Sequence, residues 1–395
     1  MKICGVVTEY NPFHNGHLYQ LEEAKKKTGA DVMIVAMSGN FLQRGEPAII
    51  DKWQRASVAI QHGADMVVEI PSAFSVQPAD LFAKGAISLL VKLGIDVLSF
   101  GSETGEGKDF SEAAKIYLEN EELINKIFQK KQAQELTYAK NMSQLLKKYF
   151  PEITLDLTQP NNMLGFAYAK ELQKKSEPIS IQTIRRKNSH YHDQKVKADD
   201  RIASATAIRK LLLSSDEWLY KKKLPFPKET QLCLHQSKLV HWEDFFPYLK
   251  YKILTASLEE LNQIYLMEEG LEYRIKAVIK EAESMTDFLT RLKTKQLSWT
   301  RLQRLCFYIL LDQKKEEVEG RLKKIDYIRV LGFNKTGQAY LSKMKRQIKT
   351  PLITNVNQKN STLLSYDITV GNVYRLADSC KIKSQDFRRK PIKID

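Results

Sequence analysis

Two histidines stand three residues apart near the amino terminus, in the stretch TEYNPFHNGH (Thr8–His17). Gly16, between His14 and His17, allows the backbone to approach a ligand closely. A helix that begins here would carry both imidazoles on one side of its first turn, where unpaired N–H groups and a partial positive charge favour phosphate. Imidazole donors can also follow the charge that develops on an α-phosphate. The pattern fits either an ordinary strand-to-helix turn or an anion site.

A second stretch with related chemistry is IASATAIRK, residues 202–210. Ser204 and Thr206 are residue types that cap helices, and Arg209 follows in the first turn of the predicted helix. Plain capping explains the two hydroxyls equally well. Together with the guanidinium, these hydroxyls would form a second anion site for β- and γ-phosphates.

Metal binding is the weaker interpretation of the histidines. The residues around His14 and His17 do not complete a usual metal-ligand set. His190 and His192, in the stretch HYHD, fall on one face of an extended segment without an evident third ligand. We therefore predict no metal between His14 and His17, and we assign no site to His190 and His192.

An alternation of strand and helix patterns sets the place of these histidines in the fold. Apolar strand patterns occupy 2–10, 30–38, 64–71 and 95–103, and helical patterns that end in glycine occupy 17–29, 51–63 and 78–94. Near-continuous apolar strands separated by helices predict a parallel sheet that is covered on both faces. We predict an α/β fold with a Rossmann-like, doubly wound parallel sheet.

The loops that follow the four strands are where the chemistry is expected, because ligands bind such sheets beyond the carboxyl ends of the strands. These loops read TEYNPFHNGH, MSGNFLQRGEP, EIPSAFSVQPAD and FGSETGEG. The position of His14 and His17 in the first loop favours the anion site over an ordinary turn.

The rest of the chain is mainly helical. Residues 108–150 are charged and helical, residues 178–186 read as a strand that returns to the sheet, and amphipathic helices predominate from about 215 until a partly extended segment begins at Tyr327. We predict two domains: residues 1–215, built on the sheet, and residues 216–395, a mainly helical and basic region.

The positive charge is concentrated near the C-terminus. Residues 301–395 contain 21 Lys and Arg against 9 Asp and Glu, a net charge of +12, so only +3 of the total +15 falls on the first 300 residues. This asymmetry favours RNA, DNA or an anionic membrane surface as a partner of the C-terminal part. A merely solubilising basic surface is the alternative.

Composition narrows the class of protein. A chain of 395 residues that is 43% hydrophobic can form two or three domains with a real core, and it has no run near the roughly 20 apolar residues that span a bilayer. The first residues form a strand pattern and not a signal peptide. Cys4, Cys233, Cys306 and Cys380 are far apart, so neither a zinc site nor a disulfide framework is predicted, and a reducing cytoplasm fits.

The two anion sites together resemble the HxGH nucleotidyltransferase superfamily, which pairs an N-terminal HxGH with a later Ser/Thr-rich helix start bearing Arg. The likeness to one family is more extensive. The ordered motifs TEYNPFHNGH, MSGNFLQRGEPAI, VVEIP, LSFGSE, NNMLGFAYAK, YHD, IASATAIRKLL, TKQLSWTRLQRL and YIRVLGFNKTG are similar to the bacterial tRNA(Met) cytidine acetate ligase family. This resemblance covers nearly the whole chain.

The resemblance implies an ATP-binding catalytic domain of nucleotidyltransferase type, followed by a tRNA-binding region. Acetate would attack the α-phosphate of ATP, which gives acetyl-adenylate and pyrophosphate. The acetyl group would then pass to N4 of the wobble cytidine of elongator tRNA(Met), which gives N4-acetylcytidine. Mg²⁺ is expected with ATP, held largely by phosphate and water, and RNA binding of this kind depends on phosphate contacts and salt.

The resemblance also implies roles for individual residues. His14 and His17 would act on the α-phosphate, and the terminal phosphates would lie near the start of the second helix. The predicted ATP-binding residues are Val7, Thr8, Glu9, Tyr10, Asn11, Pro12, Phe13, His14, Asn15, Gly16, His17, Leu18, Tyr19, Gln20, Gly101, Asn161, Asn162, Arg185, Arg186, Ser204, Thr206 and Arg209.

Several of these assignments have an alternative. Gly101 either leaves room for a base or ribose or forms a tight turn. Asn161 and Asn162 either cap the helix that follows or hydrogen-bond the ribose. We prefer Arg186 to Arg185 as the ligand contact, because only one side of an extended strand can face the ligand.

The second loop carries a weaker prediction. Gln43 and Arg44 follow the second strand, and Arg44 would supply the positive donor of a small acetate pocket, unless it is an ordinary surface arginine. Asp51 and Arg55 are four residues apart on a predicted helix, so a local ion pair is expected.

Three other functions share parts of this chemistry. One is an adenylyltransferase that acts on a phosphorylated cofactor precursor, although such an enzyme needs no long basic extension. Another is a relative of class I aminoacyl-tRNA synthetases, whose KMSKS loop has only a distant counterpart here in Ser342–Lys345, at the wrong place in the order. The third is a non-catalytic RNA-binding protein on the same fold.

Overall fold

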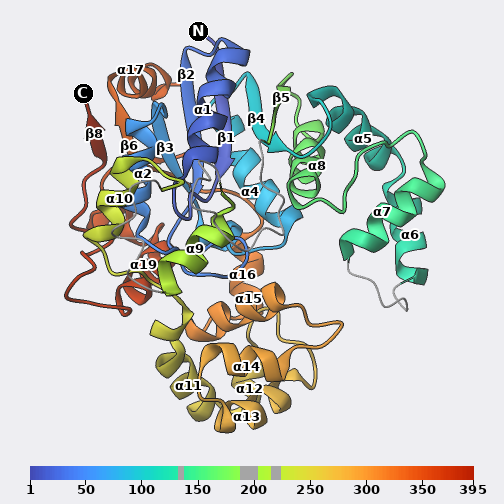
Figure 1. The fold of residues 1–395 in the computed structure, drawn as a ribbon, viewed down its shortest axis with the longest axis vertical. Coiled ribbons are helices and arrows are strands. Elements are labelled where there is room, and N and C mark those ends of the chain that lie inside the picture. The colour runs from blue at the N-terminus through green and yellow to red at the C-terminus, as the bar shows by residue number, and fades with distance from the viewer. Residues whose placement is uncertain (132–137, 187–202, 215–223) are drawn as a thin grey trace.

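The computed structural model describes residues 1–131, 138–186, 203–214 and 224–395. Figure 1 shows a sheet flanked by helices, with α11–α15 gathered below it and α5–α8 to one side. His190 and His192 lie outside the described residues. No helix in the described ranges is long and apolar enough to cross a membrane.

The elements follow the predicted alternation closely through the first hundred residues. The strands are β1 (Ile3–Thr8), β2 (Val32–Ser38), β3 (Met66–Ile70), β4 (Val97–Ser102), β5 (Ser180–Arg185), β6 (Ile328–Asn334), β7 (Leu352–Ile353) and β8 (Ile392–Ile394). The helices are α1 (Asn15–Thr28), α2 (Lys52–Gln61), α3 (Ser72–Ser75), α4 (Ala79–Lys92), α5 (Gly107–Glu119), α6 (Glu121–Lys131), α7 (Tyr138–Tyr149), α8 (Pro160–Gln173), α9 (Ala205–Ser214), α10 (Lys228–His235), α11 (Phe246–Thr255), α12 (Leu258–Asn262), α13 (Leu271–Glu281), α14 (Met285–Leu292), α15 (Trp299–Leu310), α16 (Lys315–Arg321), α17 (Lys335–Met344), α18 (Gln358–Ser361) and α19 (Ser365–Arg375).

The sheet has the order β5-β4-β1-β2-β3-β6-β7, with β8 paired to β6. The pairings from β5 to β3 are all parallel, and β6 joins β3 in the antiparallel sense. Alternate residues of β1 serve two faces: Cys4 and Val6 pack with α1 and α2, whereas Ile3 and Val7 pack with α4. The predicted doubly wound α/β fold is confirmed, and the antiparallel β6 is an addition to it.

The strand order reverses between β1 and β4. From β1 the chain moves outward through β2 and β3, and it then crosses back to place β4 on the other side of β1. Such a switch point leaves a crevice outside the carboxyl ends of the two central strands, because their connections leave in opposite directions. The loops after β1 and β4 are therefore the places to look for a ligand site.

The last part of the chain returns to the sheet. Strands β6, β7 and β8 all lie beyond residue 215 and are hydrogen-bonded into it. Buried side chains of α11, α14 and α15, among them Ile253, Phe288 and Leu305, belong to the same contiguous core as the α4 face of the sheet. The domain division near residue 215 stays a prediction. The residues on its two sides share one sheet and one core.

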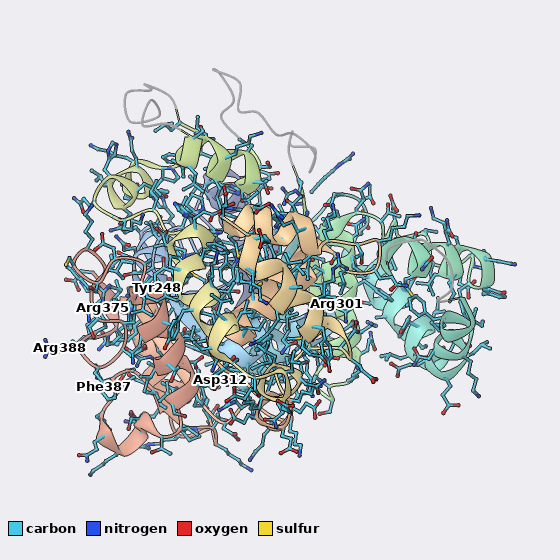
Figure 2. All side chains as sticks on the ribbon, turned by 90° about the horizontal axis from the view of Figure 1, so that it is seen from below. Tyr248, Arg301, Asp312, Arg375, Phe387 and Arg388 are labelled. Carbon is cyan, nitrogen blue, oxygen red and sulfur yellow. The ribbon has the colours of Figure 1, made fainter. Side chains whose placement is uncertain are left out.

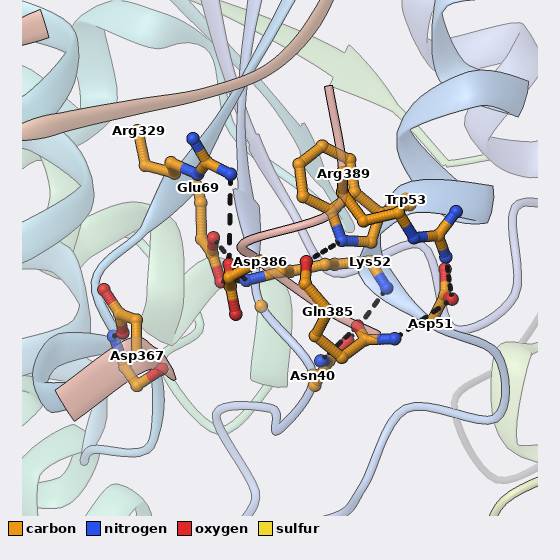
Figure 3. Close-up of polar contacts among 12 residues, drawn as sticks. Asn40, Asp51, Lys52, Trp53, Glu69, Arg329, Asp367, Gln385, Asp386 and Arg389 are labelled. Atoms are coloured by element: carbon orange, nitrogen blue, oxygen red, sulfur yellow. Dashed lines mark hydrogen bonds and ion pairs between the residues drawn. The ribbon is translucent and has the colours of Figure 1, made fainter. Parts of the chain in front are cut away.

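The C-terminal segment is anchored by a buried network of charged side chains, which Figure 3 shows in close-up. The Lys52 Nζ lies 2.9 and 2.8 Å from the two carboxylate oxygens of Glu69 and 3.1 Å from Asp386 Oδ1. Arg389 pairs with Asp51 at 2.7 Å. Burial alone would lower the pKa of Lys52, but Asp386 and Glu69 raise it above its ordinary value, so Lys52 stays charged.

Candidate active site

A cavity of about 440 Å³ opens at the carboxyl ends of β1 and β4, where the strand order reverses. We call it the main cavity. The predicted site residues that line it are Val7, Thr8, Glu9, His14, His17, Gln20, Arg44, Gly101, Asn161, Arg186, Ser204, Thr206 and Arg209. Both predicted anion sites thus face one space, although about 190 residues separate them in the sequence.

His14 and His17 are fixed by the start of α1. His14 is the N-cap residue, and its Nδ1 accepts a hydrogen bond from the backbone N–H of Gly16 at 3.1 Å. In return, the Nδ1 of His17 accepts from the backbone N–H of His14 at 3.3 Å, so the pair forms a capping box built from imidazoles. Because each Nδ1 accepts, the proton of each neutral ring lies on Nε2, which can donate to a ligand.

The backbone at the start of α1 differs from the prediction. The N–H of Asn15 donates to the carbonyl of Pro225 at 2.9 Å, and the N–H of His17 donates to the carbonyl of His14 at 2.8 Å. With the N–H of Gly16 bound to His14 Nδ1, the first three N–H groups of this helix have protein partners. The expectation of unpaired N–H groups here is wrong, and the imidazole rings are the donors that this helix start offers.

Both imidazoles are held neutral. Burial, together with the positive charges of Arg186 and Arg209, lowers the pKa of His14 to about 3. Burial, followed by the nearby His14 and Arg186, lowers the pKa of His17 well below its ordinary value. The cavity therefore combines neutral imidazole donors with guanidinium charges, which is an arrangement suited to a polyphosphate.

The second anion site is built at the start of α9. The Ser204 Oγ accepts from the backbone N–H of Ala207 at 3.1 Å, so Ser204 caps the helix and lines the cavity at once. Arg209 donates to the carbonyl of Asn11 at 3.1 Å and pairs with Glu46 at 3.2 Å. These contacts tie α9 to the loops after β1 and β2.

The loop after β4 supplies Gly101 and a support for α8. A Cβ atom on Gly101 would lie 3.7 Å from Arg186 Cγ, so neither packing nor backbone requires glycine there. Glu103 accepts from the backbone N–H groups of Asn161 and Asn162 at 3.3 and 3.0 Å. The helix is therefore capped by Glu103, and of the two alternatives for the asparagines, the one in which they cap the helix is wrong.

The two asparagines have different surroundings. Asn161 lines the main cavity. Asn162 is fully buried; its Oδ1 accepts from Ser102 Oγ at 2.8 Å, and its Nδ2 donates to Thr104 Oγ1 at 3.0 Å. Its amide is used within the protein, so only Asn161 is placed to meet a ligand.

Arg185 ends β5 and Arg186 follows it, and of the two only Arg186 reaches the main cavity, as the alternation of an extended chain allows. Arg186 lines both the main cavity and a side pocket of about 40 Å³, whereas Arg185 lines only the side pocket, together with Gly16 and Tyr19. The remaining predicted residues, Tyr10, Asn11, Pro12, Phe13, Asn15 and Leu18, are not among the described residues that line either space.

Two of these remaining residues, Tyr10 and Phe13, pack against the ring of His17. The ring of Tyr10 lies 4.7 Å from that of Phe13 and 4.9 Å from that of His17, between centroids. Asn11 Oδ1 accepts from the backbone N–H of Ile49 at 2.8 Å. Within the predicted nucleotide-binding loop, Tyr10, Asn11 and Phe13 thus have packing and positioning contacts.

The loop after β2 forms the opposite wall. Arg44 lines the cavity, and Glu9 Oε1 accepts from the backbone N–H of Gln43 at 2.8 Å. Burial raises the pKa of Glu9 above its ordinary value, and Arg44 and Arg209 oppose that shift. Arg304 of α15 donates to the carbonyl of Gln43 at 2.8 Å, so the C-terminal helices hold this loop in place.

Arg55 has a role that the sequence did not indicate. Its guanidinium is fully buried and donates to the carbonyl oxygens of Glu9, Ser38, Gly39 and Ile50. The predicted local ion pair with Asp51 is absent, because Asp51 instead caps α2 and pairs with Arg389. Arg55 therefore joins the exits of β1 and β2, the two loops that frame the cavity.

Apolar and aromatic lining residues complete the cavity and were not predicted. They include Phe82, Phe100, Leu157, Met163, Leu164 and Tyr168. In the sequence, Met163, Leu164 and Tyr168 have the spacing of ordinary helix-core residues, so no local signal distinguished them. Gln43 was noted at the second loop, and Glu46 stands three residues further along it.

Comparison with known proteins gives matches over the full length. The profile of the family described as HIGH Nucleotidyl Transferase matches residues 1–390. The chain is 41% identical to the tRNA(Met) cytidine acetate ligase of Bacillus licheniformis, with 100% of this chain and 98% of the relative covered. It is 42% identical to the same-named protein of Listeria monocytogenes serovar 1/2a, with 99% of each covered.

Solved structures agree with the fold over the same extent. Thermotoga maritima TmcAL in its apo form superposes with a TM-score of 0.90 at 30% identity, and its complex with alpha-thio ATP superposes with a TM-score of 0.89 at 30% identity. Each comparison covers 100% of both chains. By sequence and by fold, the chain belongs to the tRNA(Met) cytidine acetate ligase family of HIGH nucleotidyltransferases.

Proposed function

We propose that this chain is an ATP-dependent ligase that activates acetate as acetyl-adenylate and transfers the acetyl group to N4 of the wobble cytidine of elongator tRNA(Met). The observation that carries the proposal is one cavity in which neutral His14 and His17 face Ser204 and Arg209. The full-length similarity to ligases of that name supports the choice of substrates.

In the first step an acetate oxygen attacks the α-phosphorus of ATP. The bond from that phosphorus to the bridging oxygen of the β-phosphate breaks, and pyrophosphate leaves with the electron pair. The Nε2–H groups of His14 and His17 donate to the α-phosphate oxygens, where negative charge increases in the transition state. Ser204, Thr206 and Arg209 hold the β- and γ-phosphates, and Arg44 holds the carboxylate of acetate.

In the second step the N4 amine of cytidine attacks the carbonyl carbon of acetyl-adenylate. A C–N bond forms, the bond from that carbon to the phosphate oxygen breaks, and AMP leaves with the electron pair. The nitrogen then loses one proton to water. The products are N4-acetylcytidine and AMP, so the activating energy comes from the ATP used in the first step.

Mg²⁺ is proposed to arrive with ATP, as part of the substrate. The carboxylates of Glu9 and Glu46 line the main cavity, but the described ranges hold no group of three or more His, Cys, Asp and Glu side chains suited to a metal ion. Phosphate oxygens and water are therefore the ligands that Mg²⁺ would keep. The side chains of the cavity orient the phosphates around it.

The tRNA partner is supported by charge and by exposed aromatic side chains. Figure 2, seen from the side of α11–α14, shows Tyr248, Arg375, Phe387 and Arg388 toward one side of this view. All four side chains are exposed. The Tyr248 hydroxyl donates to the carbonyl of Leu376 at 3.5 Å. The Arg388 guanidinium and the exposed rings suit an RNA backbone and its unstacked bases, whereas the Arg375 guanidinium donates to the carbonyls of Ile382 and Ser379. The four free thiols fit the cytoplasm, where tRNA is found.

The test is acetate-dependent exchange of labelled pyrophosphate into ATP, followed by nucleoside analysis of tRNA(Met) incubated with enzyme, ATP and labelled acetate. We expect exchange without tRNA and labelled N4-acetylcytidine with it. Exchange that requires a phosphorylated cofactor precursor in place of acetate would point to the adenylyltransferase. Absence of both activities in the folded protein would point to a non-catalytic RNA-binding protein.

A further inference from the structure

A second cavity, of about 390 Å³, adjoins the main cavity where the C-terminal helices meet the sheet domain. We call it the Trp299 cavity. Glu46 and Arg209, which form an ion pair, line both cavities and mark their boundary. Its other lining residues are Pro47, Ile49, Leu213, Val240, His241, Trp242, Glu243, Met285, Thr286, Leu289, Trp299 and Gln303. Its volume lies in the range of small-ligand pockets, roughly 300–1,000 Å³.

Gln303 is the unusual member of this lining. Its side chain is buried, with 5% exposed, and its Oε1 has no hydrogen-bond partner among the described residues. A buried acceptor without a partner is costly, and since almost none of the Oε1 surface is open, a turn of the Gln303 amide toward the cavity would let it meet a donor that a ligand brings. Gln303 and Trp299 stand four residues apart on α15, which places both on one face of the helix.

The chemistry of cytosine matches these two side chains. Its ring is a flat surface that stacks on an aromatic side chain, and Trp299 is partly exposed in the cavity. Its Watson–Crick edge presents the N4–H donors beside the N3 acceptor, and a glutamine amide carries both an acceptor and donors. Uracil has an oxygen acceptor in place of the N4 amine. Two acceptors, that oxygen and Gln303 Oε1, would then face each other without a hydrogen bond, so uracil would bind less well.

We propose that the Trp299 cavity receives the wobble cytidine, turned out of the anticodon stack, with its ring on Trp299 and its N4–H donating to Gln303 Oε1. This inference rests on the proposed function. A base on which chemistry occurs must leave its stack to reach the reactive group. At the boundary formed by Glu46 and Arg209, the amine of the bound base would face the acetyl-adenylate in the main cavity.

The first test compares variants in the transfer step. Gln303→Leu removes the amide at similar size, and we expect transfer of the acetyl group to tRNA(Met) to fall at least about tenfold. Trp299→Ala should lower transfer, whereas Trp299→Phe should retain most of it. Gln296→Leu changes an exposed amide just before α15 and outside the cavity, so it serves as the matched control. Acetate-dependent pyrophosphate exchange reports whether each variant is folded.

The second test uses the unmodified enzyme. A tRNA(Met) transcript with 5-bromocytidine at the wobble position is irradiated in the complex, and the crosslinked peptide is sequenced. We expect the crosslink at Trp299. A crosslink outside this cavity, or wild-type transfer by Gln303→Leu and Trp299→Ala, would overturn the inference and leave the proposed function intact. Failure of the wild-type enzyme to form acetyl-adenylate would instead reject the proposed function.

Discussion

The imidazole rings of His14 and His17 stack with their centroids 3.6 Å apart and their planes 20° from parallel. This contact is possible because neither ring is charged at neutral pH, since burial lowers both pKa values. The stacking also follows from the capping box. In it, His14 Nδ1 accepts from the backbone N–H of Gly16, and His17 Nδ1 accepts from the backbone N–H of His14. The capping motif thus fixes the position and the tautomer of both candidate catalytic groups, and burial keeps them neutral.

Substitution of either histidine should abolish activation and leave the fold intact. His14→Asn keeps a side-chain oxygen that can cap α1, and His17→Gln keeps an amide near His14. Both lose the Nε2–H donor, so we expect acetate-dependent pyrophosphate exchange to fall about 100-fold or more. Exchange at the wild-type rate in a variant with an unchanged circular dichroism spectrum would contradict this role. His235→Gln, on exposed α10 surface, is a suitable control.

The neutral histidines also predict a pH dependence of stability in the protein without ATP. The pKa of His14 is about 3 in the folded state and about 6.5 in the unfolded chain, so the unfolded chain binds more protons between these values. The contribution of neutral His14 to the free energy of unfolding should therefore be present above pH 6.5 and be lost as the pH falls. For His14 alone, we expect the free energy of unfolding to decrease by about 1.4 kcal/mol between pH 7.5 and pH 5.5.

Urea unfolding of the wild type and His14→Asn at both pH values measures this contribution. Titrating groups distant from His14 are common to the two proteins and cancel in the comparison, whereas His17, whose pKa His14 helps to lower, adds to the difference in the same direction. We expect a smaller decrease for the variant by about the amount above. An equal decrease in both proteins would mean that His14 is protonated equally in the folded and unfolded states.

Gly101 offers a test of the shape of the main cavity. An added Cβ meets protein atoms only at 3.7 and 3.9 Å, so Gly101→Val should fold normally while its branches enter the nucleotide space. We expect the KM for ATP to rise about tenfold, as for other overpacked sites. At Gly165, in contrast, a Cβ would meet Phe100 at 2.4 Å, so Gly165→Ala should lower the thermal midpoint. An unchanged KM in Gly101→Val would place the nucleotide elsewhere.

Local patterns were sufficient to predict the first hundred residues. Glycine after each helix and near-continuous apolar strands identified β1 to β4, because helix ends and buried strands are determined mainly by nearby residues. The position of His14 and His17 after the first strand then followed from the topology of parallel sheets. This part of the site could be predicted because each step used only short-range information.

The roles of Arg55, Asn162 and Gln303 could not be predicted in this way. Arg55 binds carbonyl groups of two loops, and Asn162 binds residues of the β4 exit about 60 positions away. Gln303 stands in an ordinary helical pattern and becomes distinctive only when its Oε1 is found without a partner among the described residues. Such roles depend on tertiary packing, which single-residue spacing does not encode.

Arg55 should therefore be one of the residues on which stability depends most. Arg55→Met keeps much of the volume but leaves the carbonyl groups of Glu9, Ser38 and Gly39 without this donor. Several unsatisfied buried acceptors should lower the free energy of unfolding by about 3 kcal/mol or more. Arg291→Met removes an exposed pair with Asp287 that solvent screens, so it should leave the free energy of unfolding nearly unchanged. Similar urea midpoints for the two variants would contradict the proposed positioning role.

The role of Arg388 in tRNA binding is best tested by the salt dependence of affinity, because each contact with a phosphate releases counterions. A truncation near residue 300 would remove β6 and most of α15 from the sheet and core, so single substitutions are the sharper tool. Arg388→Ala should weaken binding of tRNA(Met) and lower the slope of log K against log salt by about 0.7–0.9.

Lys343 provides the matched control for Arg388. Lys343 is exposed on α17, and the next residue, Met344, lies near Gly94. Gly94 precedes the amino end of β4, so Lys343 lies at the edge of the sheet opposite the main cavity. Lys343→Ala should leave both the affinity for tRNA(Met) and the salt slope unchanged. Filter binding at several salt concentrations measures both quantities. If Arg388→Ala and Lys343→Ala give the same slope as the wild type, the RNA backbone follows another surface. If both lower the slope equally, binding reflects the overall charge of the protein and not a defined contact at Arg388.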